Sequence, residues 1–109
     1  MTRTQAEQIA KLINDRNQLE VRYTAERVSR DAEFYEYEVV NDTVVACVQR
    51  KELQWYQWEI LHLSVREEHE GKGFAYRVYK RAEDKANENQ VRLLQCTIRE
   101  GNVASETFF

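Results

Sequence analysis

The sequence has no proline and, among its 109 residues, only three glycines and two cysteines. We draw no functional conclusion from the missing proline. No apolar run approaches the roughly 18–20 residues of a membrane-spanning helix. The N-terminal residues also lack the apolar core of a signal peptide. These absences predict a cytoplasmic protein without a membrane partner.

The net charge has the wrong sign for a general nucleic-acid binder. The chain carries 16 basic and 19 acidic residues, a formal charge of -3, whereas such binders are normally basic. We therefore expect no nucleic-acid partner. A content of 42% hydrophobic and 32% charged residues is typical of a soluble globular protein. The length suits one domain with a single modest core.

The two cysteines, Cys47 and Cys96, lie inside predicted strands among apolar neighbours. A free cysteine packs like a small hydrophobic residue, so this placement favours buried and inert thiols. Neither the cysteines nor the two histidines have the spacing of metal ligands. The sequence therefore predicts no metal site.

Two helices are predicted before the first strand. The segment Thr4-Gln5-Ala6-Glu7 has the form of a capping box, and apolar residues at helical spacing follow it. This pattern predicts a helix from about Gln5 to Arg16. Residues 19–23 alternate like a short strand or an extended link. Thr24 then caps a short helix from Ala25 to Asp31.

Alternating apolar and polar residues next predict an antiparallel meander, followed by a strand–helix–strand unit. The fold class is therefore α+β with a mixed sheet. Asn41-Asp42 is a two-residue turn, since both residue types tolerate positive φ. Lys51-Glu52-Leu53 is a polar link. Strands joined by a helix should be parallel neighbours. The predicted strands are 34–40, 43–49, 56–65 and 91–98, with the helix at 74–87 and a last short helix from 101.

Two of the three glycines, Gly71 and Gly73, lie in one loop between a strand and the helix that starts at Phe74. Glycines let the backbone approach an anion, and the N–H groups and dipole of a helix start attract it. The loop therefore predicts a phosphorylated ligand. A Walker A motif is excluded because Phe74-Ala75 follows Gly73. A dinucleotide fingerprint is excluded because a third small residue and an all-parallel beginning are missing.

The segment Glu70-Gly71-Lys72-Gly73-Phe74-Ala75, after the strand end Leu63-Ser64-Val65, resembles the GNAT superfamily of acyl-coenzyme A-dependent N-acetyltransferases. The family signature is Gln/Arg-x-x-Gly-x-Gly/Ala, and Gly73 and Ala75 fit its small positions. The family also begins the helix after its fifth strand with an Asn, as Asn102 does here. The order of elements is similar throughout, so the resemblance implies a single GNAT-like acyl-CoA-binding domain over residues 1–109.

The resemblance implies acetyl-CoA as the cofactor. Backbone N–H groups from Gly71 to Ala75 would cradle the pyrophosphate. The strand edge at 63–65 would pair with the pantetheine arm, and one of its N–H groups would polarise the thioester carbonyl. Lys72, Arg66 or Arg77 would neutralise phosphate charge, or else be solvated surface charges. The cofactor-binding residues predicted in this way are Leu63, Ser64, Val65, Glu70, Gly71, Lys72, Gly73, Phe74, Ala75, Asn102 and Ser105.

The implied reaction is attack of an amine on a thioester. Direct transfer is preferred because neither cysteine lies in an activated setting. Some protein-acetylating members of the family carry a base Glu six residues before the matching Val, and Glu59 has that spacing from Val65. Alternatively, Glu59 is a strand residue facing solvent. His62, expected on the opposite strand face from Glu59, is the second candidate base.

An aromatic stretch, Trp55-Tyr56-Gln57-Trp58, precedes Glu59. Desolvation by its rings would raise the pKa of Glu59 towards a useful value. The same rings either wall an acceptor pocket or belong to the core. The acceptor itself stays open between a protein lysine, a peptide amino terminus and a small amine.

The chain departs from the family pattern at several places. Glu70 stands where the signature has Gln or Arg, and with Glu67 and Glu68 it makes the loop acidic. Phe109 stands where the family often has a Tyr general acid. The sequence also stops where two more strands normally follow. These departures predict a short member whose sheet is completed by a homodimer or a partner chain, or alternatively a catalytically impaired CoA-binding or protein-interaction module.

Overall fold

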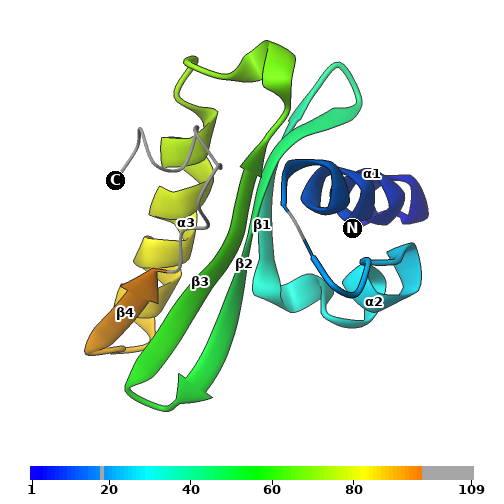
Figure 1. The fold of residues 1–109 in the computed structure, drawn as a ribbon. Helices are drawn as coiled ribbons and strands as arrows, with labels where there is room; N and C mark the ends of the chain where they lie inside the picture. The colour runs from blue at the N-terminus through cyan, green and yellow to red at the C-terminus, as the bar shows by residue number, and fades with distance from the viewer. Residues whose placement is uncertain (18, 97–109) are drawn as a thin grey trace.

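The structure is a computed structural model, described here for residues 1–17 and 19–96. Figure 1 shows a central sheet with α3 on one face and with α1 and α2 on the other. Short 3-10 turns, η1 and η2, occur at Ala32–Phe34 and Glu67–His69. The helices and strands are α1 (Arg3–Arg16), α2 (Ala25–Arg30), β1 (Tyr35–Val40), β2 (Thr43–Gln54), β3 (Gln57–Val65), α3 (Phe74–Glu88) and β4 (Leu93–Cys96).

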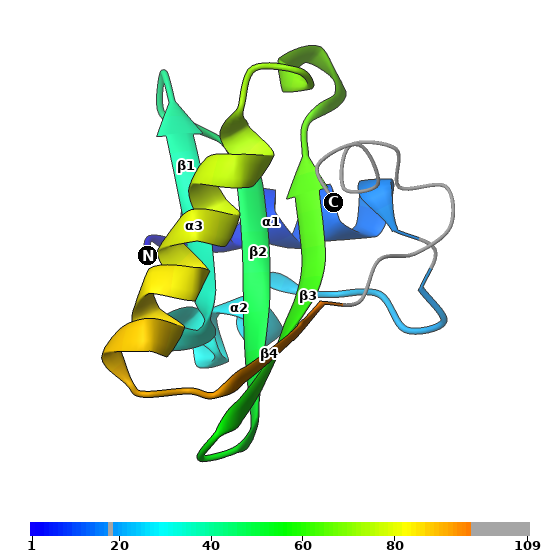
Figure 2. The same cartoon turned by 90° about the vertical axis from the view of Figure 1, so that its left-hand side faces the viewer.

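The four strands form one sheet in the order β1-β2-β3-β4. The first two pairs are antiparallel. β3 and β4 are parallel, with pairing from Gln57↔Leu93 to Ile60↔Cys96. α3 connects these two strands and packs across β1, β2 and β3, as Figure 2 shows. This arrangement confirms the predicted α+β meander followed by a parallel strand–helix–strand unit.

Among the described residues, no helix is long and apolar enough to cross a bilayer.

A separate hydrophobic cluster fills each face of the sheet. The cluster under α1 and α2 consists of Ala6, Ile9, Ala10, Leu12, Ile13, Tyr23, Ala25, Val28, Tyr35, Val44 and Cys47. The cluster under α3 consists of Ala46, Val48, Ile60, Leu63, Val65, Val78 and Ala82.

The start of α1 differs from the prediction by about half a turn. The capping box is formed by Thr2 and Gln5, not by Thr4 and Glu7. Gln5 N donates to Thr2 Oγ1 at 3.1 Å, and Thr2 N donates to Gln5 Oε1 at 2.9 Å. Glu7 is instead one helical turn from Arg3 and pairs with it at 3.1 Å. The second cap was predicted correctly, since Thr24 Oγ1 accepts from Arg27 N at 3.2 Å.

The β2–β3 hairpin is longer than predicted. The polar link expected at Lys51-Glu52-Leu53 is wrong, because β2 continues to Gln54 and pairs with β3 through Lys51↔Glu59 and Gln54↔Gln57. Backbone pairing between two adjacent strands overrides the polar composition of this segment. The two-residue turn at Asn41-Asp42 is confirmed, with φ of 50° and 63°.

The other differences are at segment ends. Residues 19–24 form an extended link with no strand. The last predicted strand is present as Leu93–Cys96, and its final residues 97–98 lie outside the described part of the chain. The short helix predicted from 101 also lies outside it.

β3 contains a bulge at His62, whose φ is 52°. The register changes from Gln49↔Leu61 to Cys47↔Ser64 at this point, so β3 carries one extra residue relative to β2. Positive φ is uncommon for a residue other than glycine. A β-bulge changes the direction in which the neighbouring side chains point. The alternation of faces along β3 is therefore broken here.

The bulge overturns the expectation that Glu59 and His62 lie on opposite faces. Leu61 lines a hollow together with Tyr23, on the side of α2. The His62 ring contacts the Tyr23 ring at 5.2 Å between centroids, so His62 is on that side too. Glu59 is two residues from Leu61 and shares its face. Both candidate bases therefore face α2.

Candidate functional site

The glycine loop adopts a backbone that requires glycine. Gly71 has φ of +76° and Gly73 has φ of +84°. A Cβ placed on either residue would meet no heavy atom within 4 Å. The requirement is therefore conformational and not steric. A non-glycine residue in this region is strained by roughly 1–2 kcal/mol.

α3 begins directly after this loop. Gly73 is its N-cap residue, and no side chain caps this end of the 15-residue helix. Gly73 O accepts from Arg77 N at 3.1 Å, which starts the helical hydrogen bonding. Phe74 and Ala75, the first helical residues, are half-buried. An uncapped first turn of this kind offers N–H groups and a positive dipole to an anion.

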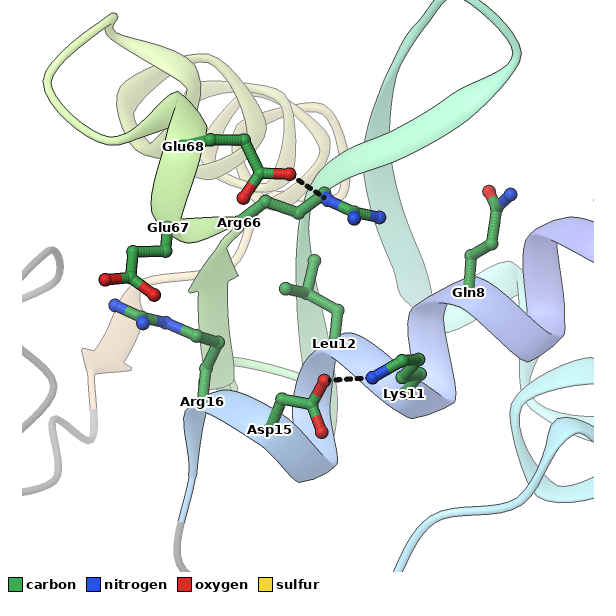
Figure 3. Close-up of a pocket in the computed structure, with 8 residues that line it drawn as sticks. All are labelled: Gln8, Lys11, Leu12, Asp15, Arg16, Arg66, Glu67 and Glu68. Carbon is green, nitrogen blue, oxygen red and sulfur yellow. Dashed lines mark hydrogen bonds and ion pairs between the residues drawn. The ribbon is translucent and has the colours of Figure 1, made fainter.

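The acidity of the loop is compensated by two arginines, one from α1 and one from the same segment. Glu70 pairs with Arg16 at the end of α1. Glu68 pairs with Arg66 at 2.9 Å. A backbone hydrogen bond and the Arg66 guanidinium hold the pKa of Glu68 below its usual value. In Figure 3, the Arg16 guanidinium also points toward the carboxylate of Glu67.

Three cations were predicted to neutralise phosphate, and two of them have carboxylate partners. Arg66 is engaged by Glu68, as above. Arg77 lies 3.5 Å from Glu38 and stacks over the Phe74 ring at 5.4 Å. Lys72 is exposed in the loop and makes no ion pair with the residues that the structure describes. Lys72 is therefore the cation of the three best placed to meet an added anion.

The strand end at Leu63–Val65 is held from both faces of the sheet. The Leu63 and Val65 side chains are buried in the cluster under α3. Ser64 is fully buried on the other side, where its Oγ donates to His62 O at 2.9 Å and accepts from Asn17 Nδ2 at 3.0 Å. The side chains of this segment are thus fixed on both faces of the sheet.

Glu59 lies half-buried in β3, with Lys51 of β2 and Gln95 of β4 as its cross-strand neighbours. The expected covering of Glu59 by Trp58 or Trp55 is wrong. Trp58 is buried on the other face, 5.0 Å from the Arg50 guanidinium, and Trp55 is 72% exposed at the hairpin turn. Adjacent strand residues point to opposite faces, so Trp58 cannot cover the Glu59 carboxylate.

A hollow of about 360 Å³ opens on the face that carries Glu59 and His62. Its wall includes Leu61 of β3 and Tyr23, whose ring touches His62. Cations and carboxylates both occur in its lining. The lining residues are Tyr23, Arg27, Asp31, Phe34, Gln49, Arg50, Lys51, Glu52 and Leu61.

A second hollow of about 250 Å³ lies between α1 and the segment that leads into the glycine loop. Figure 3 shows α1 on one side of it and residues 66–68 on the other. Its lining is largely charged and consists of Gln8, Lys11, Leu12, Asp15, Arg16, Arg66, Glu67 and Glu68.

The Cys47 thiol is buried, as predicted, and burial raises its pKa to about 12. The thiolate is disfavoured in an apolar environment, so Cys47 is a poor nucleophile. Cys96 ends β4. Within residues 1–17 and 19–96, no group of three or more His, Cys, Asp or Glu residues could hold a metal ion.

The structure gathers part of the predicted site. The end of β3, the glycine loop and the start of α3 follow one another in the chain. Glu59 and His62 lie earlier in β3 and share one face of it. Asn102, Ser105 and Phe109 lie outside the described residues. Sequence reasoning missed Arg16 and Asn17, because no local motif marks the last turn of a helix as a neighbour of a distant loop.

A family model described as the acetyltransferase (GNAT) family matches residues 3–109. A search of curated proteins found no match. Among solved structures, Rv2747 from Mycobacterium tuberculosis, in complex with CoA and NLQ, superposes with a TM-score of 0.81 at 14% identity. That match covers 98% of this chain and 67% of the other.

Two further solved structures share the fold. A ribosomal-protein-alanine N-acetyltransferase from Brucella melitensis biovar Abortus 2308 gives a TM-score of 0.76 at 19% identity, over 100% of this chain and 84% of the other. N-acetylglutamate synthase from Neisseria gonorrhoeae, complexed with coenzyme A and N-acetyl-glutamate, gives 0.73 at 20% identity, over 91% of this chain and 24% of the other. With a family model that matches nearly its whole length, this chain belongs to the acetyltransferase (GNAT) family.

Proposed function

We propose that this chain transfers an acetyl group from acetyl-CoA to an amine by direct attack. The observation that carries the proposal is the loop with two left-handed glycines, Gly71 and Gly73, which opens the uncapped helix α3 directly after β3. Membership of the GNAT family supports acyl transfer in general. The CoA complexes of two proteins with the same fold support the choice of cofactor.

The loop would hold the diphosphate of the cofactor. Main-chain N–H groups from Gly71 to Ala75 would surround its oxygens, and the α3 dipole would favour its charge. Lys72, exposed in the same loop, would add a positive charge. Asn102 and Ser105 stay in the proposed site because of the family resemblance alone.

The main chain of Leu63–Val65 would take up the pantetheine arm. Their side chains are fixed in the two cores, so this stretch is preorganised. One main-chain N–H of the stretch would donate to the thioester carbonyl as charge develops on its oxygen. A preorganised donor of this kind is typically worth about 10²–10³ in rate.

The reaction would proceed in one transfer. Glu59, or His62 as the second candidate, removes a proton from the ammonium form of the acceptor. The amine nitrogen then bonds to the carbonyl carbon, the carbon–sulfur bond breaks, and the CoA thiolate leaves. The nitrogen gives up its second proton as the amide forms, and this proton passes through water to the thiolate. General-base assistance contributes roughly 10²–10⁴-fold. Cys47, buried with its pKa raised to about 12, supports a direct route without an acetyl-cysteine.

The acceptor would enter from the α2 face, where both candidate bases lie. The hollow of about 360 Å³ beside His62 and Leu61 is a suitable place for the body of the amine. A protein lysine, a peptide amino terminus and a small amine remain the candidate acceptors. A cytoplasmic location, and a homodimer or a partner chain that completes the sheet, also stay predictions.

The test is turnover of acetyl-CoA by the purified chain, measured as release of the CoA thiol. A lysine peptide, a peptide with a free amino terminus and a small primary amine would be supplied separately. We expect release that depends on one of these acceptors. Binding of acetyl-CoA with no release above background for any acceptor would replace the proposal by the alternative of a catalytically impaired CoA-binding module.

A further inference from the structure

The last turn of α1 contacts the glycine loop across 54 positions of sequence. The contact is an ion pair between Arg16 and Glu70, the residue directly before Gly71. Its side chains are 24% and 30% exposed. The neighbouring pair Arg66–Glu68 is more exposed, at 40% and 59%. Solvent therefore screens the Arg16–Glu70 interaction less than its neighbour.

Without a partner, the Glu70 carboxylate would oppose anion binding by the loop. It carries a negative charge at the entrance to the cradle, and like charges repel more strongly where solvent access is reduced. A carboxylate near a helix N-terminus is also attracted to the N–H groups that an anion would use. An unpartnered Glu70 carboxylate would therefore compete with a bound diphosphate for the positive end of α3.

Arg16 is the cation that the fold supplies to Glu70. Arg66 is paired with Glu68, and Arg77 with Glu38. Asn17, the next residue after Arg16, fixes the end of α1 against β3. Its Nδ2 bonds Ile13 O at 2.9 Å within the helix and Ser64 Oγ at 3.0 Å. Arg16 is thus presented to the loop by a helix end that is itself anchored.

We propose that Arg16 is a positioning residue for the cofactor: it neutralises Glu70 and holds that carboxylate away from the start of α3, so that the loop accepts the diphosphate of CoA. The inference rests on the proposed function, since it assigns a role at the same cofactor site. It requires that the Arg16 charge matters only while Glu70 is charged.

The test measures acetyl-CoA affinity by calorimetry in the full chain. Arg16→Met keeps the apolar stem and removes the charge. We expect its dissociation constant to rise by about three- to tenfold, the scale of one uncompensated charge in a partly exposed site. Lys11→Met is the matched control: it removes a cation from the same helix, one that pairs with Asp15 and not with the loop. Its affinity should match the parent.

The decisive variant is Arg16→Met combined with Glu70→Gln. If Arg16 acts by neutralising Glu70, the double variant should bind acetyl-CoA as tightly as the parent. A double variant as weak as Arg16→Met would overturn the inference, and so would an Arg16→Met chain that binds normally. Should Arg16→Met fail to fold, Glu70→Gln alone decides: affinity at least equal to the parent supports the inference, and weaker binding overturns it.

Failure of the inference can be told from failure of the proposed function. A parent chain that does not bind acetyl-CoA would overturn the proposed function, and the inference with it. A parent chain that binds, with an Arg16→Met variant that binds equally well, would overturn the inference alone.

Discussion

The Ser64 hydroxyl donates to the main-chain oxygen of His62 at 2.9 Å and so closes the bulge in β3 from within. Asn17 Nδ2 donates to the same hydroxyl at 3.0 Å. Ser64 is fully buried, so solvent cannot replace either bond. One side chain therefore joins the end of α1 to the point where β3 turns His62 toward the proposed acceptor side.

Ser64→Ala should destabilise the chain because His62 O and Asn17 Nδ2 would each lose a hydrogen bond to the buried Ser64 hydroxyl. One hydrogen bond typically contributes about 0.5–1.5 kcal/mol, so the loss of two should cost about 1–3 kcal/mol of the free energy of unfolding. Urea unfolding would measure the change. Ser29→Ala, on the exposed surface of α2, is the control and should stay within about 0.5 kcal/mol of the parent. A Ser64 variant no less stable than this control would show that the bond does not hold the bulge.

Gly73→Ala should destabilise the chain although no atom blocks the added methyl group. At φ of +84°, the expected loss in unfolding free energy is about 1–2 kcal/mol. Gly73→Asn should lose less, because asparagine tolerates left-handed backbone better than alanine. In thermal unfolding, the parent should be the most stable, Gly73→Asn should be less stable, and Gly73→Ala should be the least stable. An alanine variant as stable as the parent would contradict the assigned conformation.

Glu59→Gln should depress turnover and leave acetyl-CoA affinity unchanged. The amide cannot accept the ammonium proton, so a loss of about 10²-fold or more in kcat is expected. The dependence of the rate on pH should flatten with it. Glu33→Gln, at an exposed position in η1, is a control with the same charge change. If Glu59→Gln turns over at the parent rate, Glu59 is not the general base. His62 is then the remaining candidate, and His62→Gln is the matching test.

Cys47 should be unreactive in the folded protein. Its pKa is raised to about 12 by burial, whereas an unfolded cysteine ionises near 8.5. The contribution of this thiol to stability is therefore fully present below about pH 8.5 and is lost as the pH rises toward 12. Labelling with a thiol reagent at pH 8, in a Cys96→Ser background, should occur only after unfolding. Rapid labelling of the native protein would reopen a covalent cysteine route.

Local patterns were sufficient to predict much of this fold. Three features depend only on residues that are close together in the sequence: the turn at Asn41-Asp42, the cap at Thr24 and the start of α3 after Gly73. The alternation of apolar and polar residues predicted the antiparallel meander. The helix between β3 and β4 predicted that these two strands are parallel. The glycine loop was recognisable because two of the three glycines in the chain, Gly71 and Gly73, lie only two positions apart.

Features that depend on distant segments could not be predicted in this way. The bulge at His62 arises from how β3 pairs with β2, and it reversed the expected relation between His62 and Glu59. The acidity of the loop looked unfavourable because Arg16, the partner of Glu70, lies on a helix far away in sequence. The bulge and the Arg16–Glu70 pair both depend on how distant segments pack together. The spacing of residues along one segment does not predict such contacts.

The most direct measurement is a calorimetric titration of acetyl-CoA into the purified chain, with Gly73→Ala alongside it. The account predicts saturable binding at one site, weakened in Gly73→Ala because the loop can no longer hold φ of +84° without strain. No detectable binding at about millimolar acetyl-CoA, a concentration at which even a weak site would fill, would contradict the assignment of the glycine loop as a coenzyme A site.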